Sequence, residues 1–354
     1  MKIIFVCGGT SGHINPAINI ANYLCAKDKN SKILFVGSNN KMECELVKKE
    51  GFDFRGITTS GFARKLDVHF IPRNINSIKN LFISSFQSRK ILKEFKPDIC
   101  IGTGGYVTGA FLIQASLMKI PFLIQEQNAI PGLTTKLLSK FARYVLLGNE
   151  DARKYIKSNN CVYTGNPIKS MSINTKNYQI RKELNIKSDV PIILSFGGSL
   201  GAKLINEVIL EVIKMGKYFH IHSCGTNNKD FYKLASSMKL KNAIIEEYIY
   251  GIEKFMIASD IIICRAGAMT MSELASMAKK AIIIPSPNVT NNHQFYNAKS
   301  YAKRFIASVI EEKKLSKKAL IKEIYRLLRE DNYVKREENK ACEIIFDIIF
   351  RSQQ

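Results

Sequence analysis

Short runs of β-branched and other apolar residues repeat along the first half of this chain, each followed by a turn and then by a longer helical pattern. They occupy residues 2–7, 33–36, 98–101, 122–125 and 144–147. Strands that alternate with helices in this way form parallel sheets from βαβ units. The pattern therefore predicts a doubly wound α/β domain in the first half.

The same rhythm restarts after a polar stretch at residues 170–189, with runs at 192–196, 220–223, 244–248, 261–264 and 281–284. Each half opens with an apolar strand that runs into a glycine pair, Gly8–Gly9 and Gly197–Gly198. Ligands of open parallel sheets bind beyond the carboxyl ends of the strands. We therefore expect two doubly wound Rossmann-like domains that face each other across a cleft.

The domain limits follow from the same pattern. We expect a first domain over residues 1–163 and a second over residues 164–334. The last helix, at about 335–354, has no strand after it and could pack on either domain, including back on the first. With 354 residues the chain is long enough for two separate cores.

The chain is strongly basic, with 53 Lys and Arg against 30 Asp and Glu and a net charge of +23. A positive field favours anionic partners, namely nucleic acid, anionic lipid or phosphorylated substrates. The same bias also fits a composition that is generally rich in Lys, Ile and Asn. Charge alone does not identify the partner, so the motifs are needed to distinguish these classes.

The eight cysteines form no CxxC pair, which predicts reduced thiols and neither disulfides nor a zinc site. The opening apolar run, Ile3 to Cys7, is too short for the core of a signal peptide. No stretch of 18 apolar residues occurs. We therefore expect a cytoplasmic protein whose contact with the membrane is peripheral.

The first motif, GGTSGHINPA at residues 8–17, follows the first strand directly. Its glycines allow a tight turn and a close approach to a ligand, Asn15 is expected to cap the next helix, and Pro16 suits the first turn. His13 would then project from a strand-to-helix loop toward the cleft. The alternative is a loop histidine that is bonded to nearby backbone.

The second motif, SFGGSLGA at residues 195–202, precedes a helix that we expect to begin near Leu200. Free backbone N–H groups and the Ser199 hydroxyl could receive a pyrophosphate there, although a plain βα turn is the alternative. The turn is not a P-loop. Since no acidic residue follows the second strand of either half, dehydrogenase chemistry is disfavoured.

The third motif, CRAGAMTMSELA at residues 264–275, is again a strand, a glycine turn and a helix. Thr270 and Glu273 have the spacing of a capping box, so Glu273 could hold the start of the helix. The alternative function of Glu273 is to accept the two hydroxyls of a ribose.

Amide-rich loops follow several strands, as NNHQFYNA (291–298), QEQNAIPG (125–132) and TGNPIK (164–169). Amides both donate and accept, which suits sugar hydroxyls, although Asn291 or Asn292 could be an ordinary cap. A further glycine turn, IGTGGYVTGA (101–110), would let an acceptor approach. No DxD occurs, so we expect no metal, and helix ends with Lys or Arg would meet the charge of a leaving group.

A basic segment at residues 64–96 carries eight Lys or Arg against two acids. Apolar residues interleave with these charges at helical spacing: Ile71, Ile75, Ile78, Phe82 and Phe86. An amphipathic basic helix fits docking on anionic lipid. The alternative is a solvated helix whose apolar stripe packs on its own sheet.

Taken in order, the motifs GGTSGH, GTGGYVTGA, QEQN, TGNP, GGSLGA, CRAGAMTMSE and HQFYNA, from residue 8 to residue 298, resemble the MurG family of glycosyltransferases, in family 28. The resemblance implies a metal-independent, inverting GT-B enzyme without cofactors at the cytoplasmic face of the cell membrane. Such an enzyme transfers GlcNAc from UDP-GlcNAc to the C4 hydroxyl of MurNAc in lipid I, undecaprenyl-pyrophosphoryl-MurNAc-pentapeptide, and yields lipid II and UDP. Its partners would be UDP-GlcNAc, lipid I, the anionic membrane surface and other cell-wall synthesis proteins, but no nucleic acid.

The resemblance also implies site residues. His13 would be the general base, Ser199 would bind phosphate, and Ile249 would meet the uracil through its backbone. Glu273 would hold the ribose and Gln294 the hydroxyls of GlcNAc. The remaining donor-binding positions would be Thr10, Ser11, Gly12, Asn128, Lys169, Ala268, Met269, Thr270, Met271 and Ser272.

Two positions depart from the family pattern, which commonly has Arg at Lys169 and often His at Gln125. Lys169 keeps the charge without the planar fork of Arg. Because Gln125 cannot act as a base, His13 is the motif histidine left for that role, with Glu126 as the next candidate.

Three other functions compete with this reading. The first is a GT-B glycosyltransferase that acts on diacylglycerol or another polyprenyl lipid, because its donor half would look alike. The second is a UDP-GlcNAc 2-epimerase, which shares the fold but needs no lipid acceptor. A noncatalytic nucleotide-sugar-binding protein would leave His13 without a role.

Overall fold

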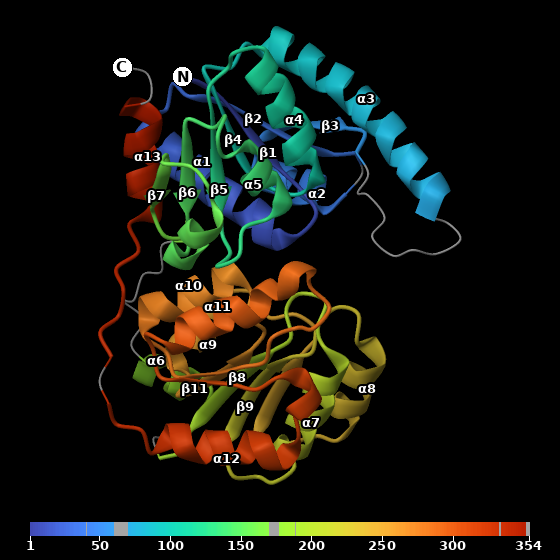
Figure 1. The fold of residues 1–354 in the computed structure, drawn as a ribbon. Coiled ribbons are helices and arrows are strands. Elements are labelled where there is room, and N and C mark those ends of the chain that lie inside the picture. Colours follow the sequence, from blue (N-terminus) through green and yellow to red (C-terminus); the bar gives the residue numbers. More distant parts are fainter. Residues whose placement is uncertain (40, 60–69, 170–176, 188, 333, 352–354) are drawn as a thin grey trace. The chain divides into compact units, whose positions relative to one another are not determined.

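The structure is a computed structural model that describes residues 1–39, 41–59, 70–169, 177–187, 189–332 and 334–351 (Figure 1). The chain divides into two compact units. The first consists of Met1–Lys169 with Asn339–Gln354, and the second of Ser170–Glu338. Each unit is a parallel sheet covered by helices.

The first unit contains a seven-stranded parallel sheet in the order β3-β2-β1-β4-β5-β6-β7. Its strands are β1 (Lys2–Cys7), β2 (Lys32–Ser38), β3 (Asp53–Ile57), β4 (Ile99–Gly104), β5 (Phe122–Glu126), β6 (Tyr144–Leu147) and β7 (Cys161–Tyr163). Its helices are α1 (Ser11–Lys27), α2 (Met42–Lys49), α3 (Phe70–Phe95), α4 (Tyr106–Leu117), α5 (Leu133–Leu138), the 3-10 helix η1 (Glu150–Tyr155) and α13 (Ala341–Arg351).

Helices cover both faces of this sheet, and successive side chains of a strand point to opposite faces, so both sets are buried. From β1, Ile4 and Val6 join a cluster that contains residues of α3 and α4. Ile3 and Phe5 join a second cluster with α1 and the last helix, α13. Figure 1 shows α13 beside α1, and its Ile345 and Ile349 are fully buried there.

The second unit contains a six-stranded parallel sheet in the order β10-β9-β8-β11-β12-β13. Its strands are β8 (Ile192–Phe196), β9 (Phe219–Ser223), β10 (Ala243–Glu246), β11 (Ile261–Cys264), β12 (Ala281–Ile283) and β13 (Ala307–Val309). Its helices are α6 (Asn177–Glu183), α7 (Lys203–Ile213), α8 (Lys229–Ser237), α9 (Ile252–Ala258), α10 (Ala268–Met277), α11 (His293–Ala302) and α12 (Lys317–Leu328), with 3-10 helices η2 (Thr290–Asn292) and η3 (Glu312–Lys314).

The strand order of each unit reverses at its first strand. In the first unit β1 lies between β2 and β4, and in the second β8 lies between β9 and β11. In such sheets the crevice beyond the carboxyl ends at the reversal is where ligands bind. The prediction of two doubly wound α/β domains is confirmed, and the turns after β1 and β8 occupy these positions.

Candidate functional site

The turn after β1 leads into α1 earlier than the sequence suggests. The helix begins at Ser11 with Thr10 as its N-cap, so Asn15 is not the cap and Pro16 is not in the first turn. Pro16 is buried inside the helix and has no N–H to donate to the Gly12 carbonyl. Consequently His13 lies in the first turn of α1, and its predicted place in a loop is wrong.

His13 is half-buried where three strand ends meet. Its Nδ1 lies 3.1 Å from Oε1 of Gln127, which follows β5, and its carbonyl oxygen accepts the Thr103 hydroxyl of β4 at 2.7 Å. Gly104, with φ of +123°, lies against the ring so closely that a Cβ there would overlap it. The ring contacts a side-chain amide, whereas the alternative from the sequence was a bond to backbone.

Behind Gln127 lies a cluster of buried amides. Gln125, Gln127 and Asn166 are each at most 3% exposed. Gln127 Nε2 donates to the side-chain oxygen of Gln125, whose own Nε2 donates to Asn166 Oδ1 at 3.1 Å. Gln127 and Asn166 were not among the predicted site residues, although both lie in motifs that the sequence singled out.

Glu126, the alternative base, is engaged by its own loop. Its Oε1 accepts the backbone N–H of Asn128 at 3.1 Å and the side-chain amide of Asn128 at 3.2 Å. Its Oε2 accepts the Gly132 N–H at 2.9 Å and the Thr135 hydroxyl at 2.7 Å. A carboxylate with four donors holds the loop and positions Asn128, so it is poorly placed to take up a proton.

The glycine turns of β1 and β4 lie against each other. A Cβ on Gly105 would overlap the carbonyl of Gly8, and a Cβ on Gly8 would lie 2.8 Å from the carboxylate of Glu43. Glu43 is fully buried, and its Oε1 accepts the Ser38 N–H at 2.9 Å. Its position below the glycine turn has no sequence signal, because the contact joins two separate βα units.

In the second unit, α7 begins at Lys203 rather than near Leu200. The preceding loop first passes against the turn after β9: the Ser199 carbonyl accepts the Thr226 N–H at 3.1 Å, and a Cβ on Gly201 would overlap the Cys224 carbonyl. This tertiary contact delays the helix. Ser199 is exposed in the loop, three residues before the N-cap Ala202.

The start of α10 after β11 shows that Thr270 and Glu273 do not form the capping box that their spacing suggested. The N-cap of α10 is Gly267, and the helix begins at Ala268, so both residues lie inside it. Burial, followed by the charge of Glu253, raises the pKa of the Glu273 carboxyl to about 7. The charge of Glu273 also acts on Tyr248, the residue before Ile249. The loop after β10 and helix α10 are therefore close enough for their ionisable side chains to interact.

Gln294 lies at the start of α11, where its Oε1 accepts the Ser286 N–H at 2.9 Å. The same loop is held from β11 by Arg265, which donates to the carbonyls of Ile284 and Pro285 at 3.2 Å each and pairs with Glu312. Asn292 is the N-cap of α11, but its side chain makes no capping bond. Arg265 was not predicted as a site residue.

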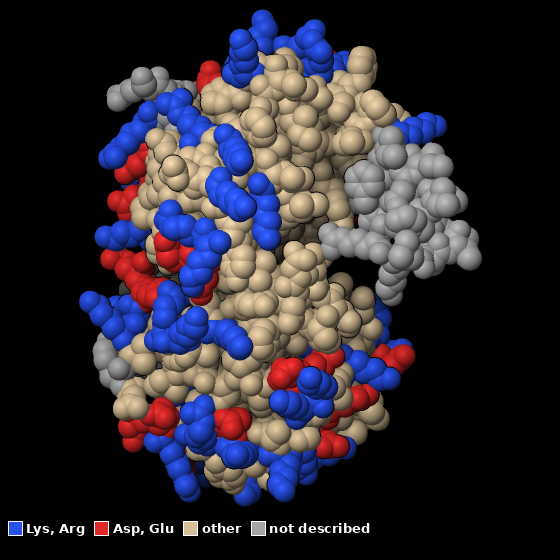
Figure 2. Space-filling model, in the orientation of Figure 1, with Lys and Arg blue, Asp and Glu red and all other residues tan. Residues whose placement is uncertain are grey.

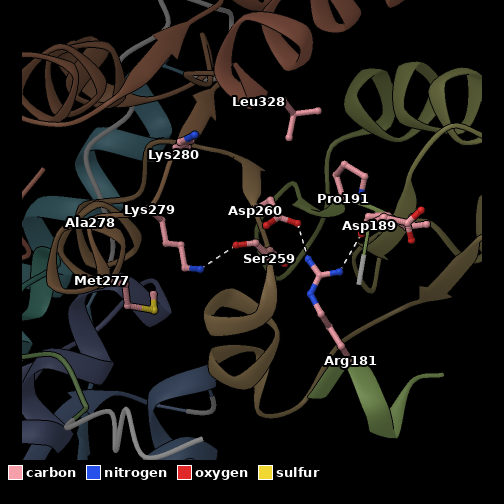
Figure 3. A pocket seen from close by; sticks show the side chains of 11 residues that line it. Arg181, Asp189, Pro191, Ser259, Asp260, Met277, Ala278, Lys279, Lys280 and Leu328 are labelled. Carbon is pink, nitrogen blue, oxygen red and sulfur yellow. Dashed lines mark hydrogen bonds and ion pairs between the residues drawn. The ribbon is translucent and has the colours of Figure 1, made fainter. Parts of the chain in front are cut away.

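A separate cavity of about 440 Å³ opens at the amino ends of β8, β11 and β12 (Figure 3). Three of its charged side chains have partners: Arg181 pairs with Asp260 at 2.7 Å, and Lys279 donates to the carbonyls of Ile257 and Ser259 at 2.7 Å each. Burial lowers the pKa of Lys279 to about 8. No predicted site residue lines this cavity, so it is distinct from the candidate site.

Within the described ranges, no group of three or more His, Cys, Asp or Glu side chains is placed to hold a metal ion. The cysteines are free thiols. None of the helices in that part of the chain combines the length and hydropathy needed to cross a bilayer.

Comparison with known proteins identifies the family. Residues 3–147 match the glycosyltransferase family 28 N-terminal domain, and residues 192–349 match the glycosyltransferase family 28 C-terminal domain. A protein from Acetivibrio thermocellus, named UDP-N-acetylglucosamine–N-acetylmuramyl-(pentapeptide) pyrophosphoryl-undecaprenol N-acetylglucosamine transferase, is 42% identical over 94% of this chain and 90% of its own.

The chain belongs to glycosyltransferase family 28.

A solved structure of MurG agrees with this family 28 assignment. The crystal structure of Acinetobacter baumannii MurG covers 99% of each chain with a TM-score of 0.76 and 25% identity. UDP-GlcNAc 2-epimerase from Neisseria meningitidis, solved with UDP-GlcNAc, covers 99% of this chain and 100% of its own with a TM-score of 0.67 at 17% identity. The epimerase likeness extends to the fold alone.

In this family 28 chain the predicted residues gather at the carboxyl ends of strands. In the first unit, Thr10, Ser11, Gly12 and His13 follow β1, and Asn128 follows β5. In the second unit, Ser199 follows β8, Ile249 follows β10, the residues from Ala268 to Glu273 follow β11, and Gln294 follows β12. Lys169 is exposed at the end of the first unit. Their individual roles remain predictions.

Proposed function

We infer that this chain transfers GlcNAc from UDP-GlcNAc to undecaprenyl-pyrophosphoryl-MurNAc-pentapeptide. The observation that carries this is the 42% identity, along both units, to a transferase named for that reaction. We further propose that the acceptor group is the C4 hydroxyl of MurNAc and that the anomeric configuration is inverted.

His13 is the proposed general base. A sugar hydroxyl is a poor nucleophile while it keeps its proton, and a single displacement requires that proton to leave as the new bond forms. His13 is half-buried beside the glycine turns of β1 and β4, where an acceptor could approach. Glu126 is less suited to this role because four donors already engage its carboxylate.

The donor is proposed to bind the second unit. The exposed loop at Ser199 would receive the diphosphate, and Glu273 and the loop at Ile249 would hold the ribose and the uracil. Negative charge that develops on the departing UDP would be met by backbone N–H groups and by Lys169. We expect this arrangement to work without a divalent cation.

We also propose that the first unit docks on the cytoplasmic face of the membrane through an apolar patch on α3, α4 and α5. The patch consists of Phe82, Phe86, Ile113, Leu117, Leu133, Leu137 and, just after α5, Phe141, which are 41–74% exposed. The three helices pack side by side. Exposed apolar side chains that gather on neighbouring helices mark an interaction site.

The described part of α3 favours docking over internal packing. Its buried residues are Ser84, Ser88, Ile91 and Leu92, of which Ile91 and Leu92 pack on the core of the unit, while Phe82 and Phe86 are 73% and 74% exposed. Ile71, Ile75, Ile78 and residues 64–69 lie outside the described side chains. Figure 2 shows Lys and Arg along the upper edge of this unit and, interspersed with Asp and Glu, along its left side. Basic side chains near a membrane surface attract anionic lipid.

A transfer assay tests the proposed function. Purified protein, radiolabelled UDP-GlcNAc and EDTA would be incubated with lipid I, with diacylglycerol, or without acceptor. We expect label to move only onto lipid I, and an anomeric analysis of the product should show inversion. Label on diacylglycerol, or epimerised UDP-sugar in the absence of acceptor, would favour one of the competing functions. Activity that EDTA abolishes and magnesium restores would overturn the metal-free mechanism.

A further inference from the structure

We propose that Gln127 is a positioning residue that fixes the tautomer of His13, with the hydrogen on Nδ1 and the lone pair on Nε2. The inference rests on the proposed function for its catalytic consequence, but the tautomer itself follows from contacts within the first unit.

The orientation of the Gln127 amide is set by backbone carbonyls. Its Nε2 lies 2.7 Å from the Thr103 carbonyl oxygen and 3.1 Å from that of Gln125. Carbonyl oxygens only accept hydrogen bonds, so the amide atom that faces them must be the NH2 group. Turning the amide over would place its oxygen against both carbonyls in a buried site and leave all of these acceptors unsatisfied.

The Gln127 oxygen then determines the state of the imidazole. Oε1 is the atom 3.1 Å from His13 Nδ1. An amide oxygen accepts and cannot donate, so Nδ1 must carry the hydrogen. A neutral imidazole has one N–H and one lone pair, which leaves the lone pair on Nε2.

A second layer of amides holds Gln127 in this orientation. The Gln125 side-chain oxygen accepts from Gln127, and its Nε2 donates to Asn166 Oδ1. Asn166 Nδ2 donates to the Gln127 carbonyl at 3.1 Å, so the direction of the chain is fixed at both ends by backbone. Gly148 leaves room for this amide, because a Cβ there would overlap it. Gln125 cannot itself act as a base, but it holds Gln127, which orients the proposed base His13.

The tautomer has a direct chemical consequence. During transfer, the O–H bond of the acceptor hydroxyl breaks and its proton goes to Nε2 of His13. The oxygen electron pair forms the bond to the anomeric carbon, and the pair of the broken sugar–phosphate bond leaves on UDP. The imidazolium then keeps its Nδ1 hydrogen bond to Gln127, whose oxygen stabilises the new positive charge. In the opposite tautomer Nε2 carries a hydrogen and cannot accept the proton.

Nitrogen NMR of protein labelled with ¹⁵N-histidine measures the tautomer without any assay of activity. The full-length chain contains five histidines, and the His13→Asn variant assigns the His13 signals. At a pH where the ring is neutral, the wild-type spectrum should show Nδ1–H and a bare Nε2. A wild-type ring with Nε2–H would overturn the proposal, and this result needs no variant of Gln127.

Gln127→Met removes the acceptor while keeping the side-chain length. We expect the His13 signals to shift toward the Nε2–H form and kcat to fall about 10-fold or more, with KM for UDP-GlcNAc little changed. Gln114→Met, which removes an amide from α4 of the same unit, should keep the wild-type tautomer. Persistence of the wild-type tautomer in Gln127→Met would overturn the proposal. A correct tautomer in a protein that transfers no GlcNAc would instead refute the proposed function alone.

Discussion

Gln294 Oε1 accepts the backbone N–H of Ser286 at 2.9 Å, so the side-chain oxygen of Gln294 is already committed within its own loop. The Nε2 group keeps both of its hydrogens for a ligand, whereas one of the two lone pairs of the oxygen is already used. If Gln294 contacts the sugar, it does so mainly as a hydrogen-bond donor.

Gln294→Glu tests this donor role. The carboxylate can still accept from Ser286, but it has no N–H for a sugar hydroxyl. We expect affinity for UDP-GlcNAc to fall about 10- to 100-fold, the cost of an unpaired polar group, and affinity for UDP to stay nearly constant. Calorimetric titration with both ligands separates the two effects. Equal losses for UDP and UDP-GlcNAc would place Gln294 away from the sugar.

His13→Ala should lower turnover by about 10²- to 10⁴-fold, the usual contribution of a positioned base, with UDP-GlcNAc affinity nearly unchanged. Steady-state kinetics with lipid I, together with donor titration, measure both quantities. A loss confined to donor affinity would make His13 a binding residue. A drop of less than about tenfold in a folded variant would mean that another group takes the proton.

The raised pKa of Glu273 predicts that the stability of the second unit depends on pH. Because burial and Glu253 raise its pKa from 4.5 to about 7, the unfolded chain ionises this carboxyl at lower pH than the folded one does. Below pH 4.5 Glu273 is protonated in both states and does not lower the free energy of unfolding. As the pH rises from 4.5 toward 7, the unfolded chain loses this proton first, and the free energy of unfolding falls. Glu273→Gln should therefore stabilise the protein relative to wild type by about 1–3 kcal/mol more at pH 8 than at pH 5.

Denaturant unfolding of both proteins at the two pH values checks this prediction, because their difference cancels the other titrating groups. Glu253→Gln is the matched control: it removes the neighbouring charge and should reduce the pH dependence only partly, since burial is the larger cause. Identical pH dependence in wild type and Glu273→Gln would contradict the assignment.

The two histidines of β9 predict acid sensitivity. Burial, and then His222, lowers the pKa of His220 to about 3, and burial lowers that of His222 to about 4 despite its 2.8 Å bond to Ser195. Below pH 6.5 these histidines are protonated in the unfolded chain but stay neutral in the folded protein. Their contribution to the free energy of unfolding is therefore complete above pH 6.5 and is lost as the pH falls toward 4.

Neither ring nitrogen of His220 has a hydrogen-bond partner in the described part of the chain, so His220→Leu removes a titrating group without breaking a polar pair. Unfolding free energies at pH 7.5 and pH 5 should differ by about 1–2 kcal/mol less in this variant than in wild type. An unchanged difference would mean that His220 is protonated in the folded state.

Replacement of Lys79, Arg89 and Lys90 by Gln should weaken binding to vesicles that contain anionic lipid, because each basic side chain near such a surface contributes about 1 kcal/mol. The effect should shrink in high salt.

Phe82→Ser with Phe86→Ser should weaken binding at every salt concentration. The matched control replaces Lys229, Lys233 and Lys241 of the second unit, and vesicle sedimentation measures all three. Unchanged sedimentation of the first variant at low salt would remove the support for docking.

The sequence by itself determined the architecture and the positions of the candidate motifs. Alternating apolar runs and helical patterns are local features, and buried parallel strands require them in this form. The glycine and amide motifs follow those runs directly, so their place at the carboxyl ends of strands was predictable. The family resemblance rested on the same segments.

Only the tertiary structure decided how these segments meet. The start of α1 ahead of Pro16, the delayed start of α7 and the position of Glu273 inside α10 all departed from local rules. The contact of His13 with Gln127 joins residues 114 positions apart, and the orientation of that amide depends on carbonyls of β4 and β5. Exposure of Phe82 and Phe86 was equally undecided, since helical spacing defines a stripe but not what covers it. Local pattern specifies an element, whereas its neighbours across the sheet specify what its side chains can do.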